Sequence, residues 1–177
     1  EFDAEITPEI ATQVYAGIAF DSKLFKYSHP ERALKAAAEL VDYGADPTWI
    51  ADQLFAHQTF ETVKTLGIAL ASTNLYADGR VATVSIDHAT FEMGGDLDAI
   101  VDHALSIEGV EVALFFKEQS LGVHRVSLRS RGKVDVNVIA RQFSGGGHQK
   151  ASGCTIENSL GESLRGLLEE VERALGS

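Results

Sequence analysis

The chain has little of what secreted and membrane proteins require. Its single cysteine, Cys154, excludes an internal disulfide and suits a reducing compartment. No apolar run reaches the roughly 20 residues needed to span a bilayer. The acidic start, EFDAEITPEI, lacks the basic and then apolar pattern of a signal peptide. We therefore expect a cytoplasmic protein with no membrane partner.

Positive charge is also scarce, except in one place. The net charge is −11, which argues against general adhesion to nucleic acid or to anionic membranes. Between residues 125 and 150, however, six basic residues accompany one acid, and the remainder of the chain carries −16. The charged residues of this block are Arg125, Arg129, Arg131, Lys133, Asp135, Arg141 and Lys150. A local basic block in an acidic body suits a small anionic ligand bound at one place.

Apolar periodicity divides the chain into two parts. Helices are expected to begin at Thr7-Pro8, near Pro30 and at Asp46-Pro47, so the first ~55 residues look all-helical. From residue 60 onward strands and helices alternate, which is typical of an α/β or α+β unit. Strands are expected over 80–86, 110–119, 124–130 and 153–156, and helices over 60–70, 135–143 and 160–175. The segment 87–106 is expected to be mainly helical with a loop at its N-terminal end, and a turn is expected over 74–79.

These patterns predict a fold of class α/β in two domains. A helical segment covers residues 1–55, a linker covers 56–64, and a small mixed α/β domain covers 65–177. The boundary falls where a polar stretch, AHQTFETVKT, separates the helical part from the alternating part.

The stretch HRVSLRSR is the first candidate for binding chemistry. Side chains alternate along a strand, so this stretch places three arginines and a hydroxyl on one face. These residues are Arg125, Ser127, Arg129 and Arg131. Guanidinium groups bind phosphate oxygens bidentately, so the face is suited to anions. The alternative is a solvated edge strand whose arginines discourage aggregation.

The second candidate is FSGGGHQKASGC, which places Gly145, Gly146 and Gly147 directly before His148. Without Cβ atoms, the backbone amides could point into a concave nest that binds oxyanions. His148 would stand at the exit of this loop and donate to a phosphate. The alternative is a flexible turn with a surface histidine. The arginine strand just upstream favours phosphate binding.

Three other positions carry side chains that could bind a metal ion or act as a nucleophile. Asp21 is expected at or just past a helix C-terminus, where the dipole disfavours a carboxylate unless Lys23 or a metal ion compensates; it could equally be an ordinary cap. Asp87-His88 resembles a metal pair but has no third ligand at a sensible spacing, so His88 is expected to open a helix. Cys154 is expected to be packed inside.

Taken together, three stretches resemble the DHH-family phosphoesterases: GIAFDSKLFKY, SIEGVEVALFFKE and VSLRSRGKVDVNVIARQFSGGGHQKASGCTI. The resemblance covers nearly the whole chain and is most specific over 126–156. GGGHQKASG is similar to the family signature GGGHxxAAG, with Ser152 in place of the second alanine. Within the family, the chain most resembles the bacterial oligoribonucleases that also act as 3′-phosphoadenosine 5′-phosphate phosphatases.

The resemblance implies different functions for the two parts of the chain. In the family, a larger N-terminal DHH domain binds two manganese ions, and a smaller DHH-associated domain closes over the substrate and grips it with the glycine motif. Residues 1–55 would be the last helices of the DHH domain, and residues 65–177 the DHH-associated domain.

The resemblance also implies roles for individual residues. Asp21 falls in the pattern G-I-x-x-D-[ST]-x-x-F, which makes it a metal ligand. Gly145–Gly147 and His148 would hold the phosphate or nucleotide end, and Arg129 the neighbouring phosphate.

The chain departs from the family pattern in two ways. The earlier metal motifs, including Asp-His-His, are absent, and Asp87-His88 lies after Asp21 instead of before it. Where the family usually has Asp-Thr-Gly, the chain has Asp21-Ser22-Lys23, which adds a charge near a cation site. Since the chain also begins at Glu1, we expect a C-terminal fragment with an incomplete metal set that does not turn over substrate alone.

The expected function is that of the C-terminal part of a manganese-dependent phosphoesterase acting on short oligoribonucleotides or 3′-phosphoadenosine 5′-phosphate. In that class, two metal ions would activate water for in-line attack, while the arginine strand and the glycines fix the terminal phosphate. Two alternatives stay open: a nucleic-acid-binding module without hydrolysis, and a cyclic dinucleotide phosphodiesterase. Residues 1–55 are expected to expose an apolar face, and therefore to pair with another copy or to be partly mobile.

Overall fold

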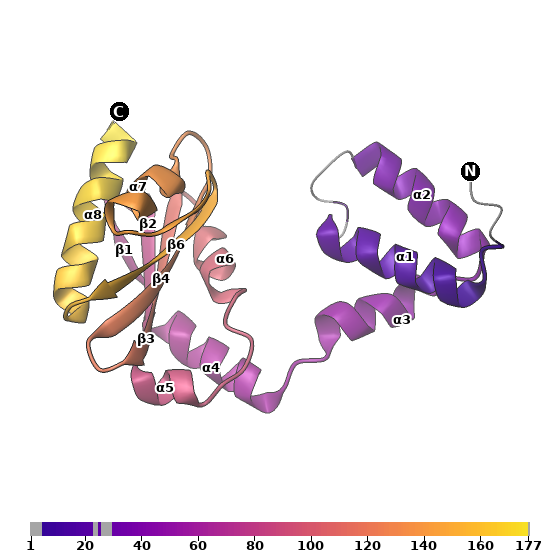
Figure 1. Ribbon diagram of the computed structural model, residues 1–177, viewed down its shortest axis with the longest axis horizontal. Coiled ribbons are helices and arrows are strands. Elements are labelled where there is room, and N and C mark those ends of the chain that lie inside the picture. Colours follow the sequence, from indigo (N-terminus) through magenta and orange to yellow (C-terminus); the bar gives the residue numbers. More distant parts are fainter. Residues whose placement is uncertain (1–4, 23–24, 26–29, 177) are drawn as a thin grey trace. The chain divides into compact units, whose positions relative to one another are not determined.

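The computed structural model describes residues 5–22, 25 and 30–176 (Figure 1). The chain divides into two compact units, Glu1–Gln58 and Thr59–Ser177, and each is described by itself. Within the described ranges, helices are too short or too polar to cross a membrane.

The first unit is helical. Its elements are α1 (Pro8–Asp21), α2 (Pro30–Asp42), α3 (Pro47–Ala51) and a π-helical segment, Asp52–Ala56, that continues α3. All three prolines of the chain are the first residues of these helices, where the missing amide costs no hydrogen bond and the fixed φ suits the helix. Asp46 caps α3 by accepting hydrogen bonds from the amides of Thr48 and Trp49 at 2.9 and 3.0 Å. A small core of Ala11, Leu40, Ala45 and Ile50 joins the helices.

The second unit is built on a six-stranded mixed sheet. The strands are β1 (Asn74–Tyr76), β2 (Val81–Ile86), β3 (Val112–Ser120), β4 (Val123–Ser130), β5 (Gly146–His148) and β6 (Ala151–Glu157). Their spatial order is β1-β2-β3-β4-β6-β5. The β2–β3 pair is parallel and the other neighbouring pairs are antiparallel. The prediction of class α/β is confirmed.

Helices cover both faces of the sheet, as Figure 1 shows for α8 on one side and α4 and α6 on the other. The helices are α4 (Phe60–Ala71), α5 (His88–Glu92), α6 (Ile100–Leu105), α7 (Val136–Gln142) and α8 (Leu160–Gly176). On one face, Phe115 of β3 packs in a core with Ile100 of α6. On the other, Val126 and Leu128 of β4 pack with Leu167 of α8. The alternate residues of β3 thus contribute to both cores, and the apolar residues of β4 to one.

Three of the sequence expectations for this unit are wrong. Residues 74–76 form β1 and not a turn, and residues 146–148 form β5 and not a loop. The loop expected at the N-terminal end of the mainly helical segment 87–106 lies instead between α5 and α6, where Gly94 and Gly95 have φ of 77° and 99°. A Cβ at Gly95 would lie 2.7 Å from the Cα of Thr62. The close approach of α4 therefore requires a glycine and ends the helix. The second unit also includes the whole of α4, so it begins before residue 65.

Candidate phosphate-binding site

The alternation expected in β4 is present. Val126 and Leu128 are fully buried in the core beneath α8, so the residues between them lie on the opposite face. Arg125 on that face is exposed and Arg129 is partly buried. Arg131 lies one residue beyond the end of β4; it is exposed, and its amide donates to the carbonyl of Glu111 at 2.8 Å.

Strand register brings the two candidate motifs together. Arg129 pairs with Ala151 of β6, and Ala151 pairs on its other side with His148 of β5. Because directly opposed residues project to the same face of an antiparallel pair, Arg129 and His148 share one face of the sheet. Their strands are two spacings apart, about 10 Å. The arginine strand and the glycine motif therefore form one surface.

Arg129, Ala151 and His148 form one row of paired residues across the sheet. The next row on the same face has almost no side chains. Ser127 of β4 pairs with Gly153 of β6, which pairs with Gly146 of β5. A Cβ built at Gly146 has Asn137 Oδ1 as its nearest neighbour, at 3.9 Å, so a side chain could be added at this position without a clash. The row is a floor of backbone beside the hydroxyl of Ser127, on which a ligand can approach closely.

Arg129 is held in place by two contacts. Its Nη1 donates to the carbonyl of Leu128 at 3.2 Å, and its Nε lies 3.6 Å from Oδ1 of Asp102 on α6. The side chain is 29% exposed. A guanidinium has five N–H donors, so these contacts orient the group and leave donors for an anion.

Lys117 belongs to this face and was not identified from the sequence. It lies on β3 directly opposite Arg125, and only 8% of it is exposed. Burial lowers the pKa of its ammonium group, Arg125 and Arg129 lower it further, and Asp98 acts in the opposite direction. The available signal was a single cation after the apolar run VALFF. We call Lys117, Arg125, Ser127, Arg129 and His148 the basic surface.

The three glycines have different structural roles. A Cβ at Gly145 would lie 2.2 Å from the carbonyl oxygen of Gly153, and one at Gly147 would lie 2.6 Å from that of Ala151. Both glycines are therefore required by the close passage of β6. Residues 146–148 are in a strand paired with β6, so the concave nest expected from the sequence is wrong for this segment. Of the three, Gly146 is the one that leaves open space.

The turn before β5 is fixed by the end of α7. Asp135 caps the helix, as predicted, by accepting from the amide of Asn137 at 2.9 Å. At the other end, Ser144 adopts φ 57°, and the Gly145 amide donates to Ala140 O at 2.9 Å. This bonding is a Schellman motif. It directs the chain out of α7 and sets the position of β5.

One member of the basic block has a structural role instead. Lys150 Nζ donates to the carbonyl of Gly132 and to that of Val134, the latter at 2.9 Å. It therefore fixes the loop after β4. The charge available to a ligand is accordingly smaller than the sequence count suggests.

Asp21 lies at the helix end, as the sequence indicated. It is the last residue of α1 and is exposed, while Ser22 caps the helix and accepts from the Phe25 amide at 2.8 Å. Lys23 lies outside the described residues. Among the residues that the structure describes, no three His, Cys, Asp or Glu side chains come together as a metal site. A metal role for Asp21 thus stays a prediction.

The two positions set aside in the sequence have structural explanations. Asp87 caps α5 by accepting from the Thr90 amide at 2.9 Å, and His88 is the first residue of that helix, as predicted. Cys154 is buried in β6, as predicted, and burial raises the pKa of its thiol to about 11.

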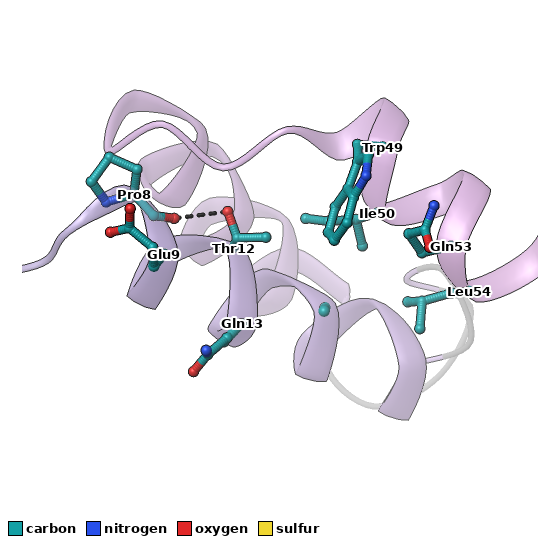
Figure 2. A pocket seen from close by; sticks show the side chains of 9 residues that line it. Pro8, Glu9, Thr12, Gln13, Trp49, Ile50, Gln53 and Leu54 are labelled. Atoms are coloured by element: carbon teal, nitrogen blue, oxygen red, sulfur yellow. Dashed lines mark hydrogen bonds between the residues drawn. The ribbon is translucent and has the colours of Figure 1, made fainter.

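The first unit has a cavity of a different character. Figure 2 shows this groove between α1 and α3, with Trp49, Ile50 and Leu54 on one side. Its volume is about 510 Å³, and Trp49 is 54% exposed. Thr12 in its wall donates to the Pro8 carbonyl at 2.7 Å. Glu9 is the charged residue in its lining, so the groove is not suited to phosphate.

The second unit combines a six-stranded mixed sheet, a basic face and a glycine-rich strand, and most of it matches the DHHA1 domain family. The chain belongs to this family: residues 78–177 match the DHHA1 domain. The match contains the whole glycine motif and the whole basic surface described above.

The chain is also similar to larger proteins. It is 33% identical over 177 residues to the bifunctional oligoribonuclease and PAP phosphatase NrnA of Thermus thermophilus, covering 97% of this chain and 52% of that protein. It is 27% identical to the cyclic-di-AMP phosphodiesterase PdeA of Listeria monocytogenes, covering 92% of this chain and 24% of that one. An exopolyphosphatase-related protein from Bacteroides fragilis superposes with a TM-score of 0.85 at 27% identity, covering 95% and 51%. The chain thus spans about half the length of the NrnA relatives it matches.

Proposed function

We propose that this chain is the substrate-holding part of a phosphoesterase that acts on short oligoribonucleotides and 3′-phosphoadenosine 5′-phosphate. The observation that carries the proposal is the alignment of Arg129 and His148 on either side of Ala151, next to the open backbone at Gly146. The phosphoesterase activity is supported by the similarity to two proteins named as oligoribonucleases and PAP phosphatases, of which this chain spans about half the length.

Each side chain has a defined task in this proposal. Arg129, oriented by Leu128 O and Asp102, donates to the oxygens of a terminal phosphate. His148 and the Ser127 hydroxyl donate from the neighbouring strands. The glycine row lets the ribose or base lie against the backbone. These groups bind and orient the ester, which is the contribution to rate that positioning supplies.

The described residues alone do not fit a two-metal centre, because no three candidate ligands meet among them. We propose that the manganese site of the whole protein takes Asp21 as one ligand and completes its set with residues outside the described ones. The support for Asp21 is the sequence pattern around it and its exposed place at the end of α1.

Calorimetric titration with 3′-phosphoadenosine 5′-phosphate tests the proposal. We expect Arg129→Met to weaken binding by about tenfold or more, because it removes a charge-assisted hydrogen bond. Arg141→Met, which removes an exposed arginine of α7 outside the basic surface, is the matched control and is expected to bind like the wild type. Equal affinity of all three proteins would contradict the proposal.

A second candidate substrate class is a cyclic dinucleotide, because of the similarity to the Listeria phosphodiesterase. Competition distinguishes the two. If cyclic di-AMP displaces 3′-phosphoadenosine 5′-phosphate at lower concentration than linear 5′-phosphorylated diadenylate does, the cyclic substrate is favoured. The reverse order favours the oligoribonucleotide.

A further inference from the structure

Lys117 is a buried cation with no direct ion pair or hydrogen bond to the described residues. It is 8% exposed, and its Nζ lies 5.4 Å from the centre of the Phe115 ring. Asp98 attracts the ammonium group without forming a direct ion pair, and the nearby guanidinium groups of Arg125 and Arg129 repel it. A buried, unpaired charge is costly unless a counter-charge arrives. The position therefore suits an anionic ligand.

The register gives this cation two polar neighbours. Lys117 pairs with Arg125 of β4, and Arg125 pairs on its other side with Thr155 of β6. Arg125 and Thr155 are exposed. The three side chains form a row across three strands, on the face that carries Arg129 and His148.

The distance between this row and the glycine motif is fixed by the strand. Arg125 and Arg129 are four residues apart on β4, which at the rise of a strand is about 13 Å. Ser127 and its glycine partners lie between the two rows. This backbone span exceeds the separation of neighbouring phosphates in a nucleotide chain, so a ligand longer than one nucleotide matches the two rows better.

We propose that Lys117, Arg125 and Thr155 form a second phosphate subsite, which binds a phosphate farther along an oligoribonucleotide whose end is held by Arg129 and His148. This inference rests on the proposed function. The backbone floor between the rows accommodates the intervening sugar and base. The subsite makes binding depend on substrate length, because a mononucleotide reaches one row and an oligonucleotide reaches both.

The test compares two ligands on the same protein, at low salt, by calorimetric titration. The ligands are 3′-phosphoadenosine 5′-phosphate and 5′-phosphorylated triadenylate, which has three phosphates in a chain. We expect Lys117→Met to weaken triadenylate binding by about tenfold and to leave binding of the bisphosphate within about twofold. Arg125→Met is expected to act in the same direction, and Lys133→Met, an exposed lysine outside the row, is expected to change neither.

The Lys117→Met protein is expected to fold, because an apolar side chain of similar length replaces a buried unpaired charge. Its thermal midpoint, measured alongside, is expected to equal or exceed that of the wild type. An equal loss of affinity for both ligands, or no loss for either, would overturn the second subsite. A wild type that binds neither ligand would overturn the proposed function, and the subsite with it. Arg125→Met keeps the test decisive if Lys117→Met does not fold.

Discussion

Two glycine-to-alanine substitutions separate the packing role of the glycine motif from its binding role. Gly145→Ala would place a Cβ 2.2 Å from Gly153 O and 2.6 Å from the Cβ of Cys154. Non-bonded atoms do not approach this closely, so β5 or β6 has to move by about 1 Å against a packed core. Overpacking of this kind costs about 3 kcal/mol. For a unit of this size, the loss corresponds to a fall in Tm of roughly 10 °C.

The matched control is Gly146→Ala. A Cβ there has 3.9 Å to its nearest neighbour, so we expect the Tm of the second unit to change by no more than about 2 °C. Because the register places Gly146 in the row of Ser127 and Gly153, the same methyl group is expected to weaken nucleotide binding while the fold stays intact.

Differential scanning calorimetry and far-ultraviolet circular dichroism measure the first effect, and titration with 3′-phosphoadenosine 5′-phosphate measures the second. If Gly145→Ala is as stable as Gly146→Ala, the close approach of β6 is not the reason why position 145 requires a glycine. If Gly146→Ala destabilises the unit as strongly as Gly145→Ala, the separation of packing from binding is wrong.

Three further predictions concern other parts of the chain. Cys154, whose pKa is raised to about 11 by burial, is expected to resist a disulfide reagent at pH 8 in the folded protein and to react fully in denaturant; fast labelling of the native state would contradict its burial. Asp46→Ala removes the carboxylate oxygen that accepts from the amides of Thr48 and Trp49 at the start of α3. It is expected to destabilise the first unit by about 1 kcal/mol, read from the fluorescence of Trp49 in urea; an unchanged midpoint would refute the cap. Hydrogen bonds from the Thr90 side chain and amide lower the pKa of Asp87, so its ionised form stabilises the fold above its unfolded pKa of about 4. The Tm deficit of Asp87→Asn is therefore expected at pH 6 and is expected to vanish as the pH falls through the lowered native pKa; a deficit that persists at pH 2 would contradict this sign.

Much of the second unit followed from local patterns in the sequence. The alternation of Val126 and Leu128 with Arg125 and Arg129 defines both faces of β4, because a strand has only two faces and apolar residues occupy the buried one. Asp135 at a helix start was identified by the preference of aspartate for that position. The glycine motif was recognisable as a binding element because of its likeness to the family signature.

The features that were missed depend on neighbours distant in the chain. Strands β1 and β5 have three residues each, and such short strands exist only because a longer strand pairs with them. Lys117 falls within the strand expected over 110–119, but the sequence does not show that Arg125 lies opposite it. The packing requirement at Gly145 is created by Gly153 and Cys154, which no local pattern indicates.

The most direct test of the account is amide chemical-shift mapping of the isotope-labelled chain with 3′-phosphoadenosine 5′-phosphate. The basic surface predicts saturable shifts concentrated at Ser127, Arg129 and His148 and in the glycines of β5, with little change in α8. Shifts confined to the α8 face of the sheet, or to the groove at Trp49, would contradict the assignment of Ser127, Arg129 and His148 as the site of the terminal phosphate.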